Sequence, residues 1–348
     1  MGDDLGRADP QGPHLHLRPE LGAVGGEADR GAADHLVVVD IAAALRRIRP
    51  LAWETPVVPL DLPGAPPTHI KIESLQHTGS FKVRGAANRL LKLDAGQRGR
   101  GVVAASSGNH GRAVAEVAGR LGIRATVCVP DWVDPVKLRA IDAAGARVVR
   151  AGASYDHAEE RAAELAAQQG LPSVHPFDDL DVIEGQGTVG LEVARQLPGV
   201  EEVIVPLSGG GLVAGIGLAV RDRGIRVVAV SAGRASVMHR SLQAGRPIEL
   251  PEEETVASAL SGGIGLANRN SFALCGQVID RHVVVDEGDI RSAVRRAFRE
   301  CRLVVEGGGA VGLAALWSGS YRPRGRAAVV VSGGNIDRHL LAALVTGR

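Results

Sequence analysis

The sequence predicts an α/β protein whose parallel sheets are covered by helices on both faces. Two observations lead to this prediction. Short apolar runs rich in β-branched residues alternate with amphipathic helical stretches along most of the chain. These runs are almost continuously apolar, which is typical of strands that are buried on both faces. No internal repeat of fixed period accompanies the alternation.

The elements follow in order from this alternation. The first helix is predicted over 38–49, because apolar residues recur at helical spacing from Ile41 to Ile48 and Pro50 follows them. Strands are predicted over 101–105, 125–129, 147–149, 202–207, 226–230, 283–285 and 327–331. Helices are predicted over 111–121, 135–144, 155–169, 187–196, 289–302 and 309–317, from 212 onward, and after 335.

Composition excludes several classes of function. The 348 residues are 45% hydrophobic, enough for a sizeable core in two lobes. Forty basic and thirty-nine acidic side chains give a net charge of +1, so we expect no binding to nucleic acid or to an anionic membrane. The three cysteines form no C-x-x-C pair, which indicates free thiols in a cytoplasmic protein.

Neither a membrane span nor a signal peptide is expected. No apolar run approaches the roughly 18 residues that a membrane span requires, and the first thirty residues lack an apolar centre. Residues 1–33 are rich in Gly, Asp, Pro and Arg without a sustained period, so we expect a disordered N-terminal tail.

The loop Ser208-Gly209-Gly210-Gly211-Leu212 follows a predicted buried strand and opens a predicted helix. Glycines let the backbone approach an anion, and a helix start offers free N–H groups and a positive dipole end. Gly209, Gly211 and Ala214 loosely match a dinucleotide pattern. That pattern also needs an acidic residue where the next strand ends, and Ser231 stands there. The loop therefore favours a single phosphate, with a tight structural turn as the alternative.

Two other loops also follow predicted strands. Ser106-Ser107-Gly108-Asn109-His110 offers hydroxyl, amide and backbone N–H groups to a carboxylate or a ring oxygen, and the alternative is an ordinary helix N-cap. His110 taken alone is more typical of a hydrogen-bonded structural histidine. Ser332-Gly333-Gly334-Asn335 ends the last strand, at the edge where open α/β sheets bind ligands, although it also fits an ordinary strand-to-helix turn.

Lys82 stands in the segment Thr78-Gly79-Ser80-Phe81-Lys82-Val83-Arg84-Gly85-Ala86. A lysine considered alone is usually a solvated surface residue. One lysine together with several phosphate-sized loops that open helices instead indicates a phosphorylated cofactor that is held covalently.

Taken together and in this order, the motifs resemble those of the pyridoxal-phosphate-dependent threonine and serine dehydratases and serine racemases, the fold-type-II family. The segment His175–Thr188 also resembles a family signature, and the resemblance extends from residue 39 to the end of the chain. It implies two open, twisted, parallel-sheet domains covered by helices, with the active site between them. Residues 34–100 and 180–348 would form the large cofactor-binding domain, and 101–179 the small domain.

The resemblance also implies a role for each motif around pyridoxal 5'-phosphate. Lys82 would form the Schiff base and remove the α-proton of the substrate. The cofactor would be held by Phe81 beside its ring, Asn109 at its ring hydroxyl, Ser208, Gly209, Gly210, Gly211 and Leu212 around its phosphate, Ser332 at its pyridine nitrogen, and Glu306 near the ring. The substrate would be bound by Ser106, Ser107, Gly108, Asn109 and His110. A neutral serine at 332 favours elimination over transamination.

The implied protein is a cytoplasmic lyase, a homodimer that acts on a small amino acid. It would eliminate the β-hydroxyl of a serine- or threonine-like amino acid to give a 2-keto acid and ammonia. Ser107 stands where racemases of this group place a second catalytic residue, on the opposite face of the substrate, so racemisation is an alternative. A non-catalytic nucleotide-binding protein is an alternative of a different class.

Three departures from the family pattern bear on metal and substrate. Ser231 replaces a glutamate that binds metal in eukaryotic-type racemases, so we expect no metal. The segment 255–259 lacks an acidic residue that faces the substrate in relatives, so neither threonine nor serine is assumed to be the natural substrate. The stretches 261–270 and 303–312 look closest to the hydroxyectoine-utilisation dehydratases. A Schiff base with the cofactor requires a free primary amine, which ectoine lacks. That branch therefore predicts a ring-opened, β-hydroxylated diaminobutyrate derivative as the substrate.

Overall fold

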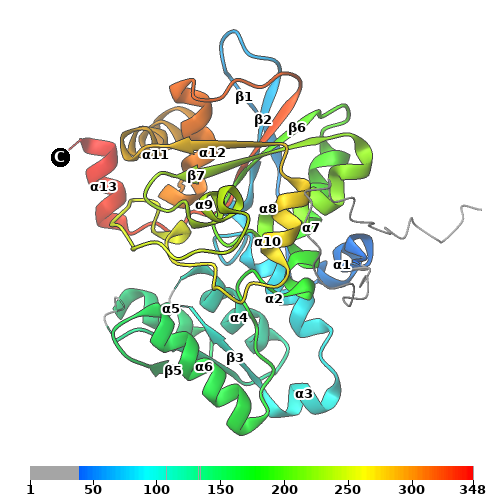
Figure 1. Ribbon diagram of the computed structural model, residues 1–348, viewed down its shortest axis with the longest axis vertical. Helices are drawn as coiled ribbons and strands as arrows, with labels where there is room; N and C mark the ends of the chain where they lie inside the picture. Colours follow the sequence, from blue (N-terminus) through cyan, green and yellow to red (C-terminus); the bar gives the residue numbers. More distant parts are fainter. Residues whose placement is uncertain (1–38, 107, 132, 134, 348) are drawn as a thin grey trace, which may run out of the picture.

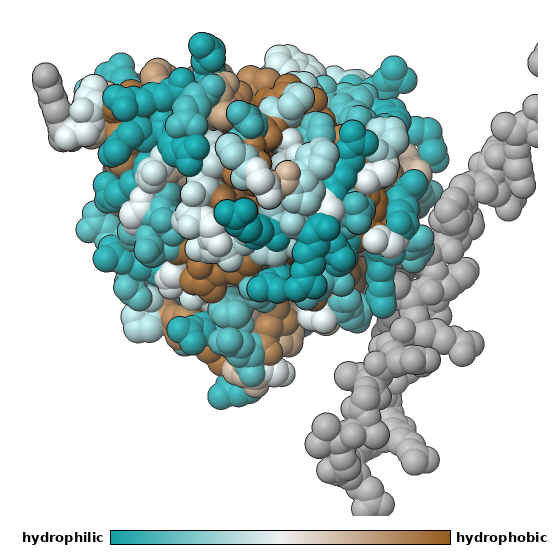
Figure 2. Space-filling model, turned by 90° about the horizontal axis from the view of Figure 1, so that it is seen from above, coloured by the Kyte–Doolittle hydropathy of each residue, from teal (hydrophilic) through white to brown (hydrophobic). Residues whose placement is uncertain are grey.

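The computed structural model describes residues 39–347 except 107, 132 and 134. The expected disordered tail, 1–33, and the candidate residue Ser107 lie outside the described residues. The predicted α/β fold with parallel sheets is confirmed (Figure 1). On the face seen in Figure 2, hydrophilic residues alternate with apolar patches. Within the described part of the chain, no helix combines the length and the apolar character that a membrane span needs.

The strands form two sheets, of six and three strands, and the larger lies above the smaller in Figure 1. The six-stranded sheet has the order β1-β2-β9-β6-β7-β8, and its pairs are parallel except for β1 with β2. The three-stranded sheet has the order β3-β4-β5 and is parallel. The strands are β1 Val57–Leu60, β2 Thr68–Ile72, β3 Val102–Ala105, β4 Ala125–Val129, β5 Arg147–Arg150, β6 Glu202–Pro206, β7 Arg226–Ala232, β8 Arg281–Val285 and β9 Ala327–Val331.

Helices connect and cover these strands. The α-helices are α1 Ile41–Ile48, α2 Lys82–Leu91, α3 Ala95–Arg100, α4 Asn109–Arg120, α5 Pro135–Ala143, α6 Tyr155–Gln169, α7 Leu180–Gln196, α8 Gly211–Val220, α9 Val237–Ala244, α10 Ser271–Val278, α11 Glu287–Cys301, α12 Gly307–Ser318 and α13 Arg338–Thr346. Short 3-10 turns are η1 Glu73–Leu75, η2 Arg221–Arg223 and η3 Ser258–Leu260.

The central strands β9 and β6 of the larger sheet are buried on both faces, as their continuous apolar runs predict. In β9, Val329 and Val331 pack in the cluster that includes α11 and α12, whereas Ala328 and Val330 pack on the other face with α7 and α8. In the smaller sheet, β3 and β4 are buried in the same way, between α2, α4 and α5 on one face and α6 on the other. The smaller sheet lies within residues 102–150, and the domain boundaries at 101 and 179 stay a prediction.

All seven predicted strands are present, but the edge strand β1 and its neighbour β2 were not predicted. β1 contains Pro59 and is the antiparallel edge strand, the position that tolerates proline. β2 carries a fully buried lysine, Lys71, so its sequence lacks an apolar run. The predicted start of α7 at residue 187 was wrong, because Asp179 caps a helix that begins at Leu180 by accepting the N–H groups of Asp181 and Val182.

Candidate active site

The Lys82 segment is bound to the end of β9. Ser80 and Gly333 form an isolated antiparallel bridge. The N–H of Phe81 donates to the carbonyl of Ser332 at 3.1 Å, and the N–H of Gly334 donates to the carbonyl of Gly79 at 2.9 Å. Two motifs from opposite ends of the described chain therefore lie side by side, with Lys82 as the first residue of α2.

A polar network brings the loop before α4 to the same place. The Asn109 amide donates to the Glu306 carboxylate at 2.6 Å, and its oxygen accepts from the Asn335 amide, also at 2.6 Å. Asn335 further donates to the carbonyl of Thr78 at 2.9 Å and accepts from Arg112 at 2.8 Å. Sequence reasoning gave Asn335 and Arg112 no role, because a bridging amide or guanidinium leaves no local signal.

The Lys82 amine is held between the loops of the two sheets. Its Nζ donates to the carbonyl of Pro176 at 2.7 Å and lies 5.2 Å from the centre of the Phe81 ring. Burial lowers the pKa of Lys82 to about 8, and the negative charge of Glu306 opposes this shift. Near pH 8 about half of these amines are therefore neutral, which is the nucleophilic and basic form.

The glycine loop presents an uncapped helix start. α8 begins at Gly211, and its N-cap is Gly210, which has the left-handed φ of 88° that favours glycine and provides no capping side chain. The hydroxyl of Ser208 donates to the carbonyl of Leu260 at 2.9 Å. The first turn of α8 thus keeps the backbone donors that the phosphate prediction requires.

Phe177 packs directly on this loop. A Cβ added to Gly209 would overlap the Phe177 ring, and one added to Gly211 would come within 2.9 Å of the Cα of Phe177. Because Phe177 follows Pro176, one short segment contacts both the Lys82 amine and the glycine loop. The signature His175–Thr188 contains both residues but gives no hint of either contact, since one involves a backbone carbonyl and the other a ring face.

The remaining candidate residues differ in what their side chains contact. Ser332 is buried at the end of β9. His110 is also buried, and its Nε2 lies 2.8 Å from the carbonyl of Val174. Burial lowers the pKa of His110 to about 3, so its side chain is neutral. Ser231 lies inside β7, with its hydroxyl 3.5 Å from the carbonyl of Leu207.

The gathered residues fit a phosphorylated aldehyde cofactor. Lys82 provides a poorly solvated amine, and the start of α8 provides anion-binding N–H groups. Space at the end of β9 depends on glycine, because a Cβ added to Gly333 would overlap the Glu306 carboxylate. Ser332 would offer a neutral hydrogen bond to a ring nitrogen.

These features define a class of protein: an enzyme built on two parallel sheets that holds a phosphorylated cofactor on a lysine between their loops. Residues 48–333 match the model of the family described as pyridoxal-phosphate dependent enzyme. The chain belongs to that family, and its cofactor is pyridoxal 5'-phosphate.

Several curated proteins are similar over most of the chain. A putative threonine dehydratase from Sinorhizobium fredii is 41% identical over 320 residues, covering 90% of this chain and 96% of the relative. An L-threonine ammonia-lyase from Geobacter sulfurreducens is 38% identical, covering 80% of this chain and 70% of the relative. A serine racemase from Oryza sativa is 33% identical, covering 92% of this chain and 98% of the relative.

Solved structures show the same likeness. Maize serine racemase has a TM-score of 0.81 at 32% identity, covering 88% of this chain and 96% of that chain. The serine racemase of Dictyostelium discoideum has a TM-score of 0.78 at 32% identity, covering 85% and 97%. The fold-type-II prediction is confirmed.

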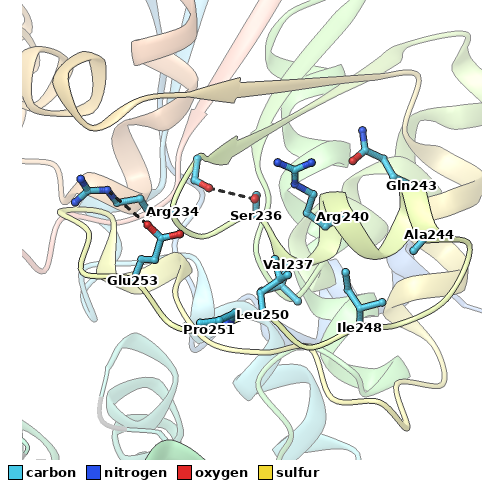
Figure 3. Close-up of a pocket in the computed structure, with 11 residues that line it drawn as sticks. Arg234, Ser236, Val237, Arg240, Gln243, Ala244, Ile248, Leu250, Pro251 and Glu253 are labelled. Atoms are coloured by element: carbon cyan, nitrogen blue, oxygen red, sulfur yellow. Dashed lines mark hydrogen bonds and ion pairs between the residues drawn. The ribbon is translucent and has the colours of Figure 1, made fainter.

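A separate cavity of about 570 Å³ lies between α9 and the chain that follows it (Figure 3). It contains none of the residues predicted for the cofactor or the substrate. Arg240 and Gln243 extend from one side of α9 in this view, and Leu250 and Pro251 lie below them. Arg234 donates to the carbonyl of Glu254 at 2.9 Å at the other end of the cavity.

Proposed function

We propose that this protein is an ammonia-lyase of the threonine and serine dehydratase type. It would eliminate the β-hydroxyl of a small hydroxy amino acid and release a 2-keto acid and ammonia. The observation that carries the proposal is the partly buried Lys82 amine, with its pKa of about 8, beside the buried, neutral Ser332 and the open start of α8. The similarity to proteins named threonine dehydratase and L-threonine ammonia-lyase supports it.

Each protein group has a part that follows from its position. Bound pyridoxal phosphate supplies the stabilisation of negative charge at the α-carbon of an amino acid. Lys82 Nζ would accept the α-proton, and the Pro176 carbonyl orients that amine. The first turn of α8 would bind the phosphate. Ser332 would hold the ring nitrogen without transferring a full proton to it, which favours elimination over transamination.

The natural substrate is a finer proposal that rests on sequence resemblance. We propose a β-hydroxylated diaminobutyrate derivative, because 261–270 and 303–312 resemble the hydroxyectoine-utilisation dehydratases. The segment that lacks the expected acidic residue, 255–259, lies beside the Glu306 motif and the glycine loop. A Cβ on Gly307 would overlap the carbonyl of Val256, and the carbonyl of Leu260, the residue after the segment, accepts from Ser208. A panel of β-hydroxy amino acids with keto acid and ammonia assays tests this. Turnover of intact hydroxyectoine by the isolated enzyme would contradict it.

Racemisation is the second candidate activity. Ser107 supports it, as does the similarity to a protein named serine racemase. Assays that follow enantiomer and keto acid together separate the two activities. We also propose that the protein is cytoplasmic, which its free cysteines support, and that it forms a homodimer. Light scattering on the purified protein tests the dimer.

The cofactor test is direct. Purified protein should be yellow, and borohydride should fix the cofactor on the peptide that contains Lys82. Lys82→Ala should lower dehydratase activity about 1,000-fold or more, whereas Lys92→Ala, which removes a partly exposed lysine, should leave it nearly unchanged. Substantial activity in Lys82→Ala would contradict the proposed function. A colourless protein that binds NAD would favour the nucleotide-binding alternative.

A further inference from the structure

We propose that Arg84 is a positioning residue, which fixes the first turn of α2 through a buried charge cluster and so aims the Lys82 amine into the site. The cluster consists of Lys71, Glu73, Arg84 and Glu192. The inference rests on the proposed function, in which Lys82 holds the cofactor.

The cluster is buried and electrically balanced. The side chains of Lys71 and Glu73 are 0% exposed, that of Arg84 is 1% exposed and that of Glu192 is 2% exposed. Burying two cations and two anions is costly unless each is paired and hydrogen-bonded. Such a cluster is a poor source of stability, so its precise geometry suggests another use.

Arg84 uses its whole guanidinium in this cluster. Its Nε and one terminal nitrogen donate to the two oxygens of Glu73, both at 2.8 Å. Its two terminal nitrogens donate to the two oxygens of Glu192, both at 2.7 Å. Further bonds reach the carbonyl of Trp53 at 3.0 Å and the hydroxyl of Thr188 at 3.1 Å. Bidentate pairs of this kind fix orientation as well as distance.

Lys71 extends the cluster to the sheet. From β2 it donates to Glu192 at 2.6 Å, to the carbonyl of Thr55 at 2.7 Å and to Gln196 at 2.9 Å. Glu73 belongs to η1, which follows β2, and Glu192 belongs to α7. The cluster therefore ties α2 to β2 and to α7 at one point.

This point lies opposite Lys82 on the helix. Residues two apart on an α-helix are separated by about 200° around its axis, so Lys82 and Arg84 leave α2 on opposite sides. Close backbone packing supports the same turn: a Cβ on Gly185 would come within 2.7 Å of the Cα of Gly85. Among the described residues, no side chain caps the N-terminus of α2. A small rotation of α2 about its axis would swing the Lys82 amine away from Pro176.

The test compares Arg84→Lys with a matched control. Arg84→Lys keeps the positive charge but loses the two bidentate pairs with Glu73 and Glu192. The control is Glu202→Gln, which also alters a buried charge. Glu202 stands at the start of β6, pairs with Arg226 and is far from the Lys82 segment in sequence. Thermal unfolding measures the stability lost in each variant. Glu192→Gln is the second variant if Arg84→Lys fails to fold.

The first readout needs no cofactor. The apo protein is labelled with trinitrobenzenesulfonate across the alkaline range, and the label is quantified on each lysine, at 71, 82, 92 and 137. In Arg84→Lys, fragment mass spectra separate label on Lys82 from label on the new lysine at 84. The midpoint for Lys82 should lie near 8 in the parent and move upward by about one pH unit or more in Arg84→Lys, because a displaced amine is better solvated. The control should keep the parent midpoint. Equal midpoints in Arg84→Lys and the control would overturn the inference.

The second readout is the dissociation constant for pyridoxal phosphate, followed by absorbance. We expect roughly tenfold weaker binding or more in Arg84→Lys and a smaller effect in Glu192→Gln, with no change in the control. If the parent itself captures no cofactor on Lys82, the proposed function fails. If the parent captures it and Arg84→Lys does so equally well, only the positioning role fails.

Discussion

The Asn109 amide donates to the Glu306 carboxylate at 2.6 Å and so joins residues 197 positions apart. Asn109 begins α4, which packs on the three-stranded sheet, while Glu306 is the N-cap residue of α12 on the six-stranded sheet. This charge-assisted bond therefore helps to connect the loops of the two sheets at the site.

A double-mutant cycle on this pair should show strong coupling. We expect Asn109→Ala and Glu306→Ala to be non-additive by about 1.5–3 kcal/mol, the range for hydrogen bonds to charged groups. Urea unfolding of the two single variants and the double variant measures this coupling. The exposed Arg296–Glu300 pair, which is closed by bonds of 2.9 and 3.0 Å, is the control and should couple far less. Additive behaviour at 109 and 306 would contradict the network.

The pH dependence of cofactor capture should follow Lys82. Because burial lowers the pKa of Lys82 to about 8, the neutral fraction rises about tenfold per pH unit below 8 and levels off above it. The rate at which apo protein captures pyridoxal phosphate should follow the same curve. Glu306→Gln removes a charge that raises this pKa, so its curve should shift to lower pH. A midpoint near the ordinary lysine value in the parent would contradict the burial of the amine.

Gly209→Ala should disturb the phosphate loop through a specific clash. The new methyl group would overlap the Phe177 ring, and we expect a cost of about 1–3 kcal/mol and weaker cofactor binding. Gly276→Ala is the control, since its methyl group would meet Leu242 at an ordinary 3.5 Å. Phe177→Leu in the same chain as Gly209→Ala should recover part of the lost stability. Full tolerance of Gly209→Ala would show that the ring moves freely.

Ser107→Ala should separate elimination from racemisation. If Ser107 serves the opposite face of the substrate, its removal lowers racemisation at least about tenfold and leaves keto-acid formation within a few-fold of the parent. Chiral chromatography of the remaining amino acid, together with a keto-acid assay, measures both rates. Parallel loss of the two activities would assign Ser107 to substrate binding alone.

The sequence predicts the apolar strands well and the polar elements poorly. β9 was predicted because Ala327–Val331 is wholly apolar, and its burial on both faces follows. β2 was not predicted, because a lysine such as Lys71 is acceptable inside a sheet only when it is paired. Its partner is the carboxylate of Glu192, 121 residues later in the chain. The motif around Lys82 was visible, but its partner is a backbone carbonyl, that of Pro176, which any residue would provide. The local sequence pattern shows which side chains a segment buries, but it does not show which distant residues contact them.

The place of β9 in the sheet has a consequence for synthesis of the chain. β9 is the last of the described strands to be made, yet it pairs with β2 on one side and β6 on the other. Until it emerges from the ribosome, β2 and β6 each present an open edge, and Ser332 and Asn335 are absent from the site. The nascent protein is therefore most exposed to aggregation just before it gains the ability to bind its cofactor.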